Sequence, residues 1–176
     1  MNGPILSIIT VNFNNNLGLL KTLESVSSQS FSSYEHIIID AGSTDGSRET
    51  IIQYEKENPH LSFWSSESDK GIYDGMNKGI DHAKGQYLYF LNSGDCLSQD
   101  ILAKIPFDGT EYLYGDTILF YKRKTKKRVY PDTLDLIYLS DNSLHSVIGV
   151  YLSVIITIYI RLVYIFHITC RYCYIT

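Results

Sequence analysis

The sequence predicts an α/β fold in which a mostly parallel sheet carries helices on both faces. Two observations support this prediction. Short apolar runs typical of buried strands alternate with helical patterns along the first half of the chain, and such alternation indicates a parallel sheet. Clusters rich in Asp, Asn, Ser and Gly follow the strands. Ligands of open α/β sheets bind outside the carboxyl ends of the strands, so these clusters are the expected site.

Four strands are expected where short apolar runs end in turn-forming residues, and these strands cover residues 5–13, 36–39, 61–65 and 86–91. Three helices are expected where apolar residues recur every three or four positions, and these helices cover residues 17–29, 47–57 and 74–84. In the first helix the recurring positions are Leu19, Leu20, Leu23 and Val26. Gly85 is the expected C′ residue of the third helix.

The pattern changes beyond Cys96. A short strand is expected at residues 112–116. Two further strands, at 118–121 and 128–130, flank the basic run 122–127 and predict a hairpin with a solvated, basic tip.

Composition narrows the possible classes of protein. A length of 176 residues suits one domain, and contents of 44% hydrophobic and 19% charged residues favour a buried core. The formal net charge of −4 gives no general case for nucleic-acid binding. Three cysteines, two of them in a bare Cys170-x-x-Cys173 pair, predict neither a disulfide framework nor a zinc site. No signal-peptide pattern precedes the first strand, so a reducing, cytoplasmic setting is expected.

Asp40 ends the second predicted strand and precedes a Gly-Ser-rich turn. A carboxylate at this point can accept a hydrogen bond from a ring N–H, such as that of uracil or thymine. The alternative is that Asp40 caps the next helix, because Asp is a preferred cap. Ser43, Thr44 and Asp45 lie closer to that helix, which leaves Asp40 for ligand binding.

Asp95 follows Asn92-Ser93-Gly94, just beyond the fourth predicted strand. Mg²⁺ and Mn²⁺ prefer oxygen ligands, and Mg²⁺ typically uses one or two carboxylates together with substrate phosphates. Breaking a sugar–diphosphate bond leaves extra negative charge on the diphosphate, which a bound cation stabilises. The alternative is that Ser-Gly-Asp is only a tight turn, which these residues favour.

Residues 69–79 are the most distinctive stretch, with two Asp, two Lys and three Gly around a predicted helix start. Asp69 can contact the hydroxyl groups of a ribose or of a sugar. Lys70 can offset the charge of a phosphate. Asp74 has a plain alternative role, because a carboxylate in the first turn stabilises the helix dipole.

Together these motifs resemble the family 2 glycosyltransferases with a GT-A fold, a Rossmann-like nucleotide-diphospho-sugar transferase fold. The resemblance is strongest to bacterial enzymes that build O-antigen, capsule or colanic-acid-like polysaccharide. Order and spacing both fit over roughly residues 4–143, and the matching segments are 6–14, 38–47, 66–79 and 91–95.

The resemblance implies a role for each matched position. Thr10, Val11 and Asn12 would line the nucleotide pocket, Asp40 would bind the base, and Asp69 with Lys70 would contact the nucleotide-sugar. Ser93-Gly94-Asp95 occupies the place of the family's Asp-x-Asp motif. Because its first position is Ser, Asp95 would be the main protein ligand of a Mn²⁺ or Mg²⁺ ion. Ser93 and Gly94 would contact the nucleotide-sugar.

The implied reaction is transfer, with inversion, of a sugar from a nucleotide-diphosphate sugar to an acceptor. A UDP-sugar is favoured as donor, and the acceptor would be a saccharide or lipid-linked saccharide of bacterial surface polysaccharide or lipopolysaccharide. The setting would be the cytoplasm or the inner face of the plasma membrane. Residues 122–128 are a weaker candidate for contact with anionic lipid headgroups.

Two segments are expected, a nucleotide-sugar-binding domain at 1–144, incomplete on its acceptor side, and an apolar tail at 145–176. The tail contains no Asp, Glu or Lys. Its composition fits either a membrane segment, because 147–166 has the necessary length, or a frameshift after about residue 144. We favour the frameshift, because Arg161 lies inside the apolar run. The catalytic base, which is unassigned, would then be missing, and turnover by this chain is uncertain.

Three alternatives were weighed against this prediction. A dinucleotide-dependent oxidoreductase predicts Gly-x-Gly-x-x-Gly after the first strand, whereas the sequence there is Asn12-Phe13-Asn14-Asn15-Asn16. A protein that binds a nucleotide-sugar without turnover remains open, and donor hydrolysis or transfer distinguishes it from an enzyme. A membrane-anchored regulator also remains open, and membrane partitioning distinguishes it.

Overall fold

The protein is an α/β structure in the computed structural model, which describes residues 3–109, 112–121, 124–129, 147–150 and 173–175. A six-stranded sheet has the order β3-β2-β1-β4-β9-β6. Its strands are β1 Leu6–Asn12, β2 Tyr34–Asp40, β3 Leu61–Ser66, β4 Tyr87–Phe90, β6 Tyr112–Tyr114 and β9 Val147–Val150. The first four strands are mutually parallel, whereas β9 is antiparallel to both β4 and β6. The predicted mostly parallel sheet is confirmed.

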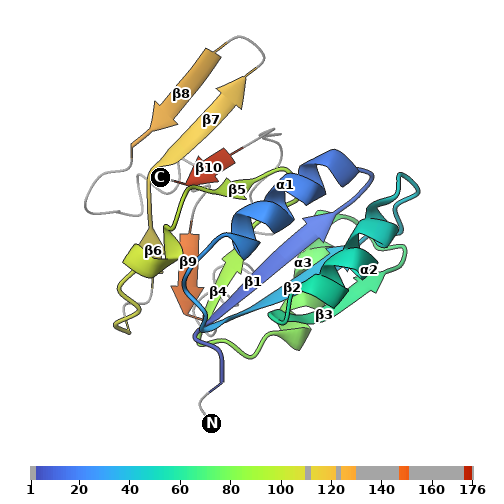
Figure 1. Ribbon diagram of the computed structural model, residues 1–176, viewed down its shortest axis with the longest axis horizontal. Helices are drawn as coiled ribbons and strands as arrows, with labels where there is room; N and C mark the ends of the chain where they lie inside the picture. Colours follow the sequence, from blue (N-terminus) through green and yellow to red (C-terminus); the bar gives the residue numbers. More distant parts are fainter. Residues whose placement is uncertain (1–2, 110–111, 122–123, 130–146, 151–172, 176) are drawn as a thin grey trace.

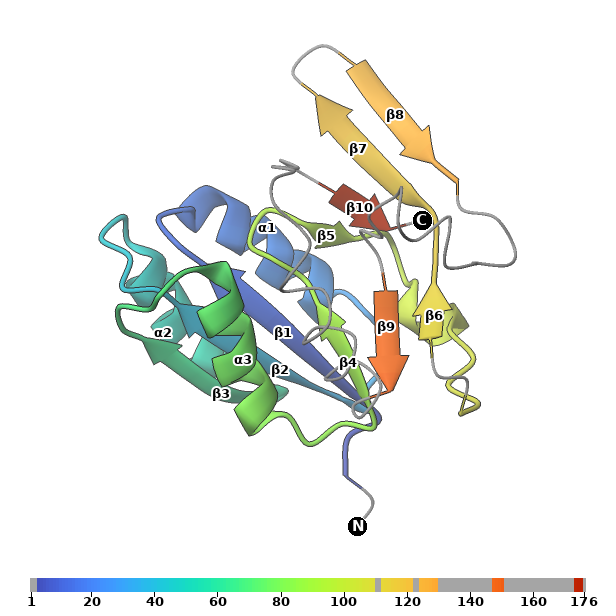
Figure 2. The ribbon, with the colours of Figure 1, turned by 180° about the vertical axis from the view of Figure 1, so that it is seen from behind.

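Helices cover both faces of the sheet, as the sequence predicts (Figures 1 and 2). The helices α1 Asn16–Ser27 and α2 Ser47–Glu57 lie on one face, and α3 Ile72–His82 lies on the other. Alternation along β2 explains this arrangement, because successive side chains of a strand point to opposite faces. Ile38 packs in the cluster that includes Leu19 of α1 and Ile51 of α2, while Ile37 packs in the cluster that includes Ile80 of α3.

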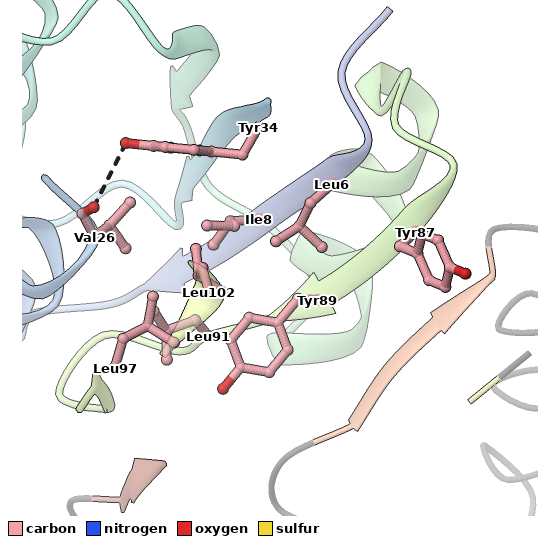
Figure 3. Close-up of a cluster of buried hydrophobic side chains, with 9 residues drawn as sticks. All are labelled: Leu6, Ile8, Val26, Tyr34, Tyr87, Tyr89, Leu91, Leu97 and Leu102. Carbon is pink, nitrogen blue, oxygen red and sulfur yellow. Dashed lines mark hydrogen bonds between the residues drawn. The ribbon is translucent and has the colours of Figure 1, made fainter. Parts of the chain in front are cut away.

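A third buried cluster joins the sheet to the chain that follows β4 (Figure 3). It is built from side chains of β1, β2, β4, α1 and the segment 91–102, and contains Leu6, Ile8, Val26, Tyr34, Tyr87, Tyr89, Leu91, Leu97 and Leu102. Two residues of this segment, Leu97 and Leu102, are at most 4% exposed. The chain after β4 is therefore held against the sheet and α1 by burial of apolar side chains.

A smaller second sheet has the order β5-β10-β7-β8. Its strands are β5 Cys96–Leu97, β7 Thr117–Tyr121, β8 Lys124–Arg128 and β10 Cys173–Ile175. A short 3₁₀ helix, Leu102–Lys104, follows β5. The predicted hairpin is present, and β7 and β8 form it. The prediction that the basic residues lie at its tip is wrong, because Lys124–Arg128 forms the edge strand β8. Lysine is common on edge strands, where its charge opposes pairing with other chains.

Other element predictions also need correction. Leu20, expected on the apolar face of the first helix, is 47% exposed. Gly85 is not the C′ residue of α3, which ends at His82 with Ala83 as its cap. A Cβ at Gly85 would lie 2.5 Å from the backbone nitrogen of Ser7, so close approach to β1 explains the glycine.

Most of the predicted tail lies outside the described residues. Two short pieces are described, and β9, which follows the boundary expected at residue 144, pairs with β4 and β6 in the main sheet. In the described ranges no helix has the length and apolar character needed to cross a membrane. The choice between a frameshifted and a membrane-bound tail stays a prediction.

Glycines allow α3 to approach the sheet closely. A Cβ at Gly79 would lie 2.4 Å from Cγ2 of Ile9, and a Cβ at Gly75 would lie 2.5 Å from Cγ1 of Val11. Both methyl groups belong to β-branched residues, whose side chains have little freedom to move aside. The distance between α3 and β1 is therefore set by the lack of side chains at these two positions.

We predict that Gly79→Ala destabilises the fold, although alanine is the better helix former. Overpacking should lower the free energy of unfolding by about 1–3 kcal/mol, which outweighs a gain of up to about 1 kcal/mol in helix propensity. Urea unfolding followed by circular dichroism measures the difference. Asp81→Ala, at an exposed position of the same helix, is the matched control, and equal stability of the two variants would contradict close packing at Gly79.

Candidate functional site

Strand pairing brings three of the predicted site residues together at the carboxyl ends of the central strands of the main sheet. We call this side of the sheet the carboxyl edge. Asn12, the last residue of β1, is paired with Asp40, the last residue of β2. On the other side of β1, the amide of Ser93 donates to the carbonyl of Val11 (3.0 Å), which continues the β1–β4 pairing beyond Phe90. Because neighbouring strands lie about 4.8 Å apart, Asp40 and Ser93 are separated by roughly 10 Å across Asn12.

Asp40 is fully buried and accepts four hydrogen bonds. Its Oδ1 accepts from Asn12 Nδ2 (2.7 Å) and Ser43 Oγ (2.5 Å), and its Oδ2 accepts from the Ser43 amide (2.9 Å) and Ser66 Oγ (2.6 Å). Burial raises the pKa of this carboxyl group, but the hydrogen bonds from Ser43, Ser66 and Asn12 together lower it below its usual value. Asp40 is therefore a preorganised carboxylate that joins β1, β2, β3 and the turn after β2.

Asn12 presents an unsatisfied acceptor next to Asp40. Its amide nitrogen donates to Asp40 Oδ1 and to Ser43 Oγ (3.2 Å), and the residue is 4% exposed. Its Oδ1 has no hydrogen-bond partner among the described residues. A buried oxygen without a partner costs free energy, so this atom marks a point where a bound donor group would be stabilising.

Thr10 and Val11 are core positions of β1. Thr10 is fully buried, and its hydroxyl lies 2.9 Å from Nε2 of His36, whose Nδ1 lies 3.1 Å from the hydroxyl of Tyr54. Val11 is 7% exposed and packs beneath Gly75 of α3. Their expected place in a nucleotide pocket stays a prediction.

The loop after β1 is tied to the loop after β2 by hydrogen bonds of Asn14 and Asn16, through their backbone N–H groups and the Asn14 side chain. The Asn14 amide donates to Ser43 Oγ (2.8 Å), and Asn14 Oδ1 accepts from the Thr44 amide (2.9 Å). The Asn16 amide donates to Asp45 Oδ2 (2.7 Å), while Asp45 Oδ1 accepts from the hydroxyl of Ser47 (2.6 Å) at the start of α2. These bonds hold both loops in one arrangement beside Asp40.

The sequence analysis did not assign these asparagines. The signal that could have identified them is the run Asn14-Asn15-Asn16 itself, because asparagine readily bonds nearby backbone groups. Phe13 was also missed. Its side chain is 64% exposed directly after Asn12, whereas an aromatic residue inside a polar run is usually expected to be buried.

The turn Ser93-Gly94-Asp95 is held from the side of α1. Gly94 has φ +101°, a conformation that favours glycine. Its amide donates to Thr22 Oγ1 (2.9 Å), and the Thr22 hydroxyl donates to the Asp95 carbonyl (2.8 Å). Ser93 and Asp95 are half-buried, so both side chains retain access to the surface.

The stretch at the start of α3 lies over the same edge of the sheet. Asp69 Oδ1 accepts from the Gly71 amide (2.8 Å), and its Oδ2 would lie 3.2 Å from a Cβ at Gly75, so Asp69 packs on the first turn of α3. Lys70 is exposed. Asp74 accepts from the Lys70 amide (3.2 Å) and forms an ion pair with Lys78 (3.7 Å), which fits its predicted structural role.

The turn Ser93-Gly94-Asp95 and the neighbouring Asn92 offer oxygen atoms that could bind a divalent cation. Within the ranges that the structure describes, no group of three or more His, Cys, Asp or Glu side chains gathers around one point. The turn offers the half-buried carboxylate of Asp95 and, at Asn92, a buried Oδ1 without a partner among those residues. One carboxylate with neighbouring oxygens fits an ion that substrate phosphates complete.

Comparison with known proteins identifies a family and a set of relatives. The sequence model described as "Glycosyl transferase family 2" matches residues 7–143. An uncharacterized glycosyltransferase of Mycobacterium tuberculosis is 42% identical over 57% of this chain and 38% of its own length. TuaG of Bacillus subtilis, named as a teichuronic acid biosynthesis glycosyltransferase, is 37% identical over 57% and 40%. A PGL/p-HBAD biosynthesis glycosyltransferase of Mycobacterium bovis is 30% identical over 68% and 49%. The chain spans less than half of the length of each.

Solved structures share the fold. S. aureus TarS 1-349 has a TM-score of 0.66 at 17% identity, over 86% of this chain and 48% of that chain. The same protein in complex with UDP-GlcNAc has a TM-score of 0.50 at 21% identity, over 56% and 29%. The mannosyltransferase PcManGT from Pyrobaculum calidifontis, in complex with GDP-Man and Mn²⁺, has a TM-score of 0.57 at 18% identity, over 64% and 35%. The predicted GT-A-like α/β fold is confirmed.

The buried histidine beneath the site predicts acid sensitivity. Burial lowers the pKa of His36 to about 3 from its ordinary value of 6.5. Below pH 6.5 the unfolded chain therefore binds a proton at His36 that the folded chain does not bind. The free energy of unfolding should fall as the pH drops from 6.5 toward 3, by up to ~1.4 kcal/mol per pH unit.

Urea unfolding between pH 7.5 and 5 tests this prediction with wild type and His36→Gln, which cannot titrate. His36→Gln should be less stable at pH 7.5, because its contacts with Thr10 and Tyr54 change. It should also lose less stability than wild type as the pH falls to 5. Parallel pH profiles for the two proteins would show that His36 does not titrate as its burial implies.

Proposed function

The chain belongs to glycosyl transferase family 2, and we propose that its α/β domain binds a nucleotide-diphosphate sugar for transfer to a bacterial surface polysaccharide. One observation carries this proposal: Asp40 and Asn12 end two adjacent parallel strands, and Ser93 lies beside Asn12 just beyond the end of a third. Their separation of roughly 10 Å, set by the strand spacing, matches the scale of a nucleoside diphosphate laid across the strand ends. The edge is the one at which open α/β sheets bind ligands.

The nucleoside would lie at the β1–β2 end of this edge. Asp40 is the preorganised carboxylate there, and Asn12 Oδ1 is the acceptor that needs a donor. A ring N–H of uracil is such a donor, which favours a UDP-sugar. Phe13, exposed directly beside Asn12, offers a face on which a base can stack.

The diphosphate would lie at the β4 end, near Ser93-Gly94-Asp95. Asp95 would hold Mn²⁺ or Mg²⁺ together with the phosphate oxygens, and Lys70 would offset further negative charge from the start of α3. A cation in this position stabilises the charge that develops on the leaving diphosphate. Asp69, which packs on the first turn of α3, would contact the ribose or the sugar.

The proposed reaction is an inverting transfer. The oxygen of an acceptor hydroxyl attacks the anomeric carbon while the bond from that carbon to the diphosphate oxygen breaks, and the diphosphate leaves with the bonding electrons. A general base takes the proton of the hydroxyl, and no residue of this chain is assigned to that role. Relatives named for teichuronic acid and PGL/p-HBAD biosynthesis support a saccharide or lipid-linked acceptor. Contact of the basic strand β8 with anionic lipid headgroups stays a prediction.

A nucleotide-binding screen tests the proposal directly. UDP, GDP, TDP and CDP are titrated with and without Mn²⁺, and UDP with Mn²⁺ should bind most tightly. Absence of binding for all four nucleotides would overturn the proposal. Incubation with UDP-sugars then separates an enzyme from a protein that only binds, because only an enzyme releases or transfers the sugar.

We predict that Asp40→Ala weakens UDP binding measured by calorimetry. The substitution removes the carboxylate and releases Asn12, whose amide is oriented by Asp40. Ser66→Ala is the matched control, because it removes one of the four hydrogen bonds to Asp40 and keeps the charge. Unchanged UDP affinity in a folded Asp40→Ala protein would make Asp40 a purely structural residue.

We predict that Asp95→Ala abolishes the effect of Mn²⁺ on UDP affinity, because Asp95 is the main protein ligand proposed for the ion. Binding of UDP without metal should persist, since the base contacts lie on other strands. Titrations of UDP at several Mn²⁺ concentrations measure both quantities. A metal effect of undiminished size in Asp95→Ala would place the ion elsewhere.

A further inference from the structure

One side of α1 carries polar side chains that bind the backbone of the chain after β4. From Asn15 at its N-cap to Gln29 just past its end, the positions 15, 22, 25 and 29 recur at near-helical spacing and share one side of the helix. Each contacts a backbone group between residues 93 and 102. We call these four side chains the α1 ladder.

The upper half of the ladder contacts the turn that holds Asp95. Asn15 Nδ2 donates to the Ser93 carbonyl (2.9 Å), while Asn15 Oδ1 accepts from the Gly18 amide (3.3 Å) and caps the helix. Thr22 Oγ1 accepts from the Gly94 amide (2.9 Å) and donates to the Asp95 carbonyl (2.8 Å). The backbone of Ser93, Gly94 and Asp95 is thus bound at each residue by a side chain of α1.

The lower half of the ladder contacts the chain beyond the turn. Ser25 Oγ accepts from the Leu97 amide (3.1 Å), and Gln29 Oε1 accepts from the Leu102 amide (3.0 Å). Gln29 Nε2 also donates to the Gln99 carbonyl. These bonds fix β5 and the 3₁₀ helix but do not involve residues 93–95.

Thr22 is a costly choice for a helix position that only needs packing. It is fully buried, in a helix whose neighbouring core positions are Leu19, Leu23 and Val26. Threonine is a poorer helix former than leucine, and a buried hydroxyl must find hydrogen-bond partners. The hydroxyl lies 3.1 Å from the Gly18 carbonyl one helical turn earlier, but it is closer to the Asp95 carbonyl (2.8 Å) and also accepts from the Gly94 amide (2.9 Å). It therefore holds the backbone on both sides of the Gly94–Asp95 peptide.

We propose that Asn15 and Thr22 are positioning residues, which hold the Ser93-Gly94-Asp95 turn so that the Asp95 carboxylate meets a diphosphate-bound cation. The inference rests on the proposed function and extends it to α1, which has no ligand-binding role in the motifs of the sequence. Residues that orient a metal ligand typically change metal affinity 10–100-fold when they are replaced. The N-terminal half of α1 therefore sets metal affinity without touching the ion.

The test compares Thr22→Val, which keeps the shape and loses the hydroxyl, with Thr22→Ser, which keeps the hydroxyl. Calorimetry measures UDP affinity with and without Mn²⁺ in the full chain. Thr22→Val should lose about tenfold or more of the Mn²⁺-dependent gain in UDP affinity, with metal-free affinity unchanged, and Thr22→Ser should retain the gain. Ser25→Ala, which removes the next hydroxyl of the ladder below the turn, should also retain it.

Asn15→Ser provides a second route if Thr22→Val does not fold. Serine still caps α1 but is too short to reach the Ser93 carbonyl, so the Mn²⁺-dependent gain should again fall. A full Mn²⁺ effect in folded Thr22→Val or Asn15→Ser, or an equal loss in Ser25→Ala, would overturn the positioning role and leave the proposed function intact. A wild-type chain that binds UDP with no Mn²⁺ effect at all would overturn both the metal assignment and the positioning role.

Discussion

Parallel pairing of β1 with β2 and β4 is the constraint on which the site depends. It brings the ends of three strands to one edge, so residues 12, 40 and 93 become neighbours although 81 positions separate the first from the last. Central strands are buried on both faces, and β1 accordingly has no side chain more than 7% exposed. Ligand chemistry is therefore confined to the strand ends and the loops, and the apolar run that fixes the sheet also fixes the spacing of the site.

Asp40 shows how the fold and the site share one group. A carboxylate removed from water is costly unless hydrogen bonds replace its hydration, and Asn12, Ser43 and Ser66 supply those bonds. The donors come from two strands, β1 and β3, and from the loop after β2, so burying the charge of Asp40 also locks these parts to β2. One consequence is that Asn12 presents its amide oxygen in a fixed direction, because its nitrogen is committed to Asp40. The side chains that a ligand would contact are already fixed in the free protein, which lowers the entropic cost of binding.

The sequence predicted the strands and helices of residues 5–91 well because apolar periodicity reports burial, and the core of this region is formed by β1, β2 and the helices over them. Apolar periodicity gave no signal where the buried side chains are polar. Thr22 and Gln29 are buried through hydrogen bonds to backbone and leave no hydrophobic pattern, whereas Leu20 fitted the pattern and is exposed. Motif resemblance selected Asp40 and the turn at Asp95 but could not show that Asp40 is saturated by protein donors, since two of those donors, Asn12 and Ser66, are distant in sequence.

The two sides of α1 explain why a helix, and not a loop, borders the proposed metal turn. Its apolar side, with Leu19 and Leu23, packs on Ile38 of β2, which fixes the helix relative to the sheet. Its polar side binds residues 93–102, which have little regular structure of their own and need external partners for their backbone groups. A loop would leave the turn free to adopt several arrangements, each with the Asp95 carboxylate in a different place. A rigid helix transfers the order of the sheet to the turn, so the position of a metal ligand outside the sheet is determined by packing inside it.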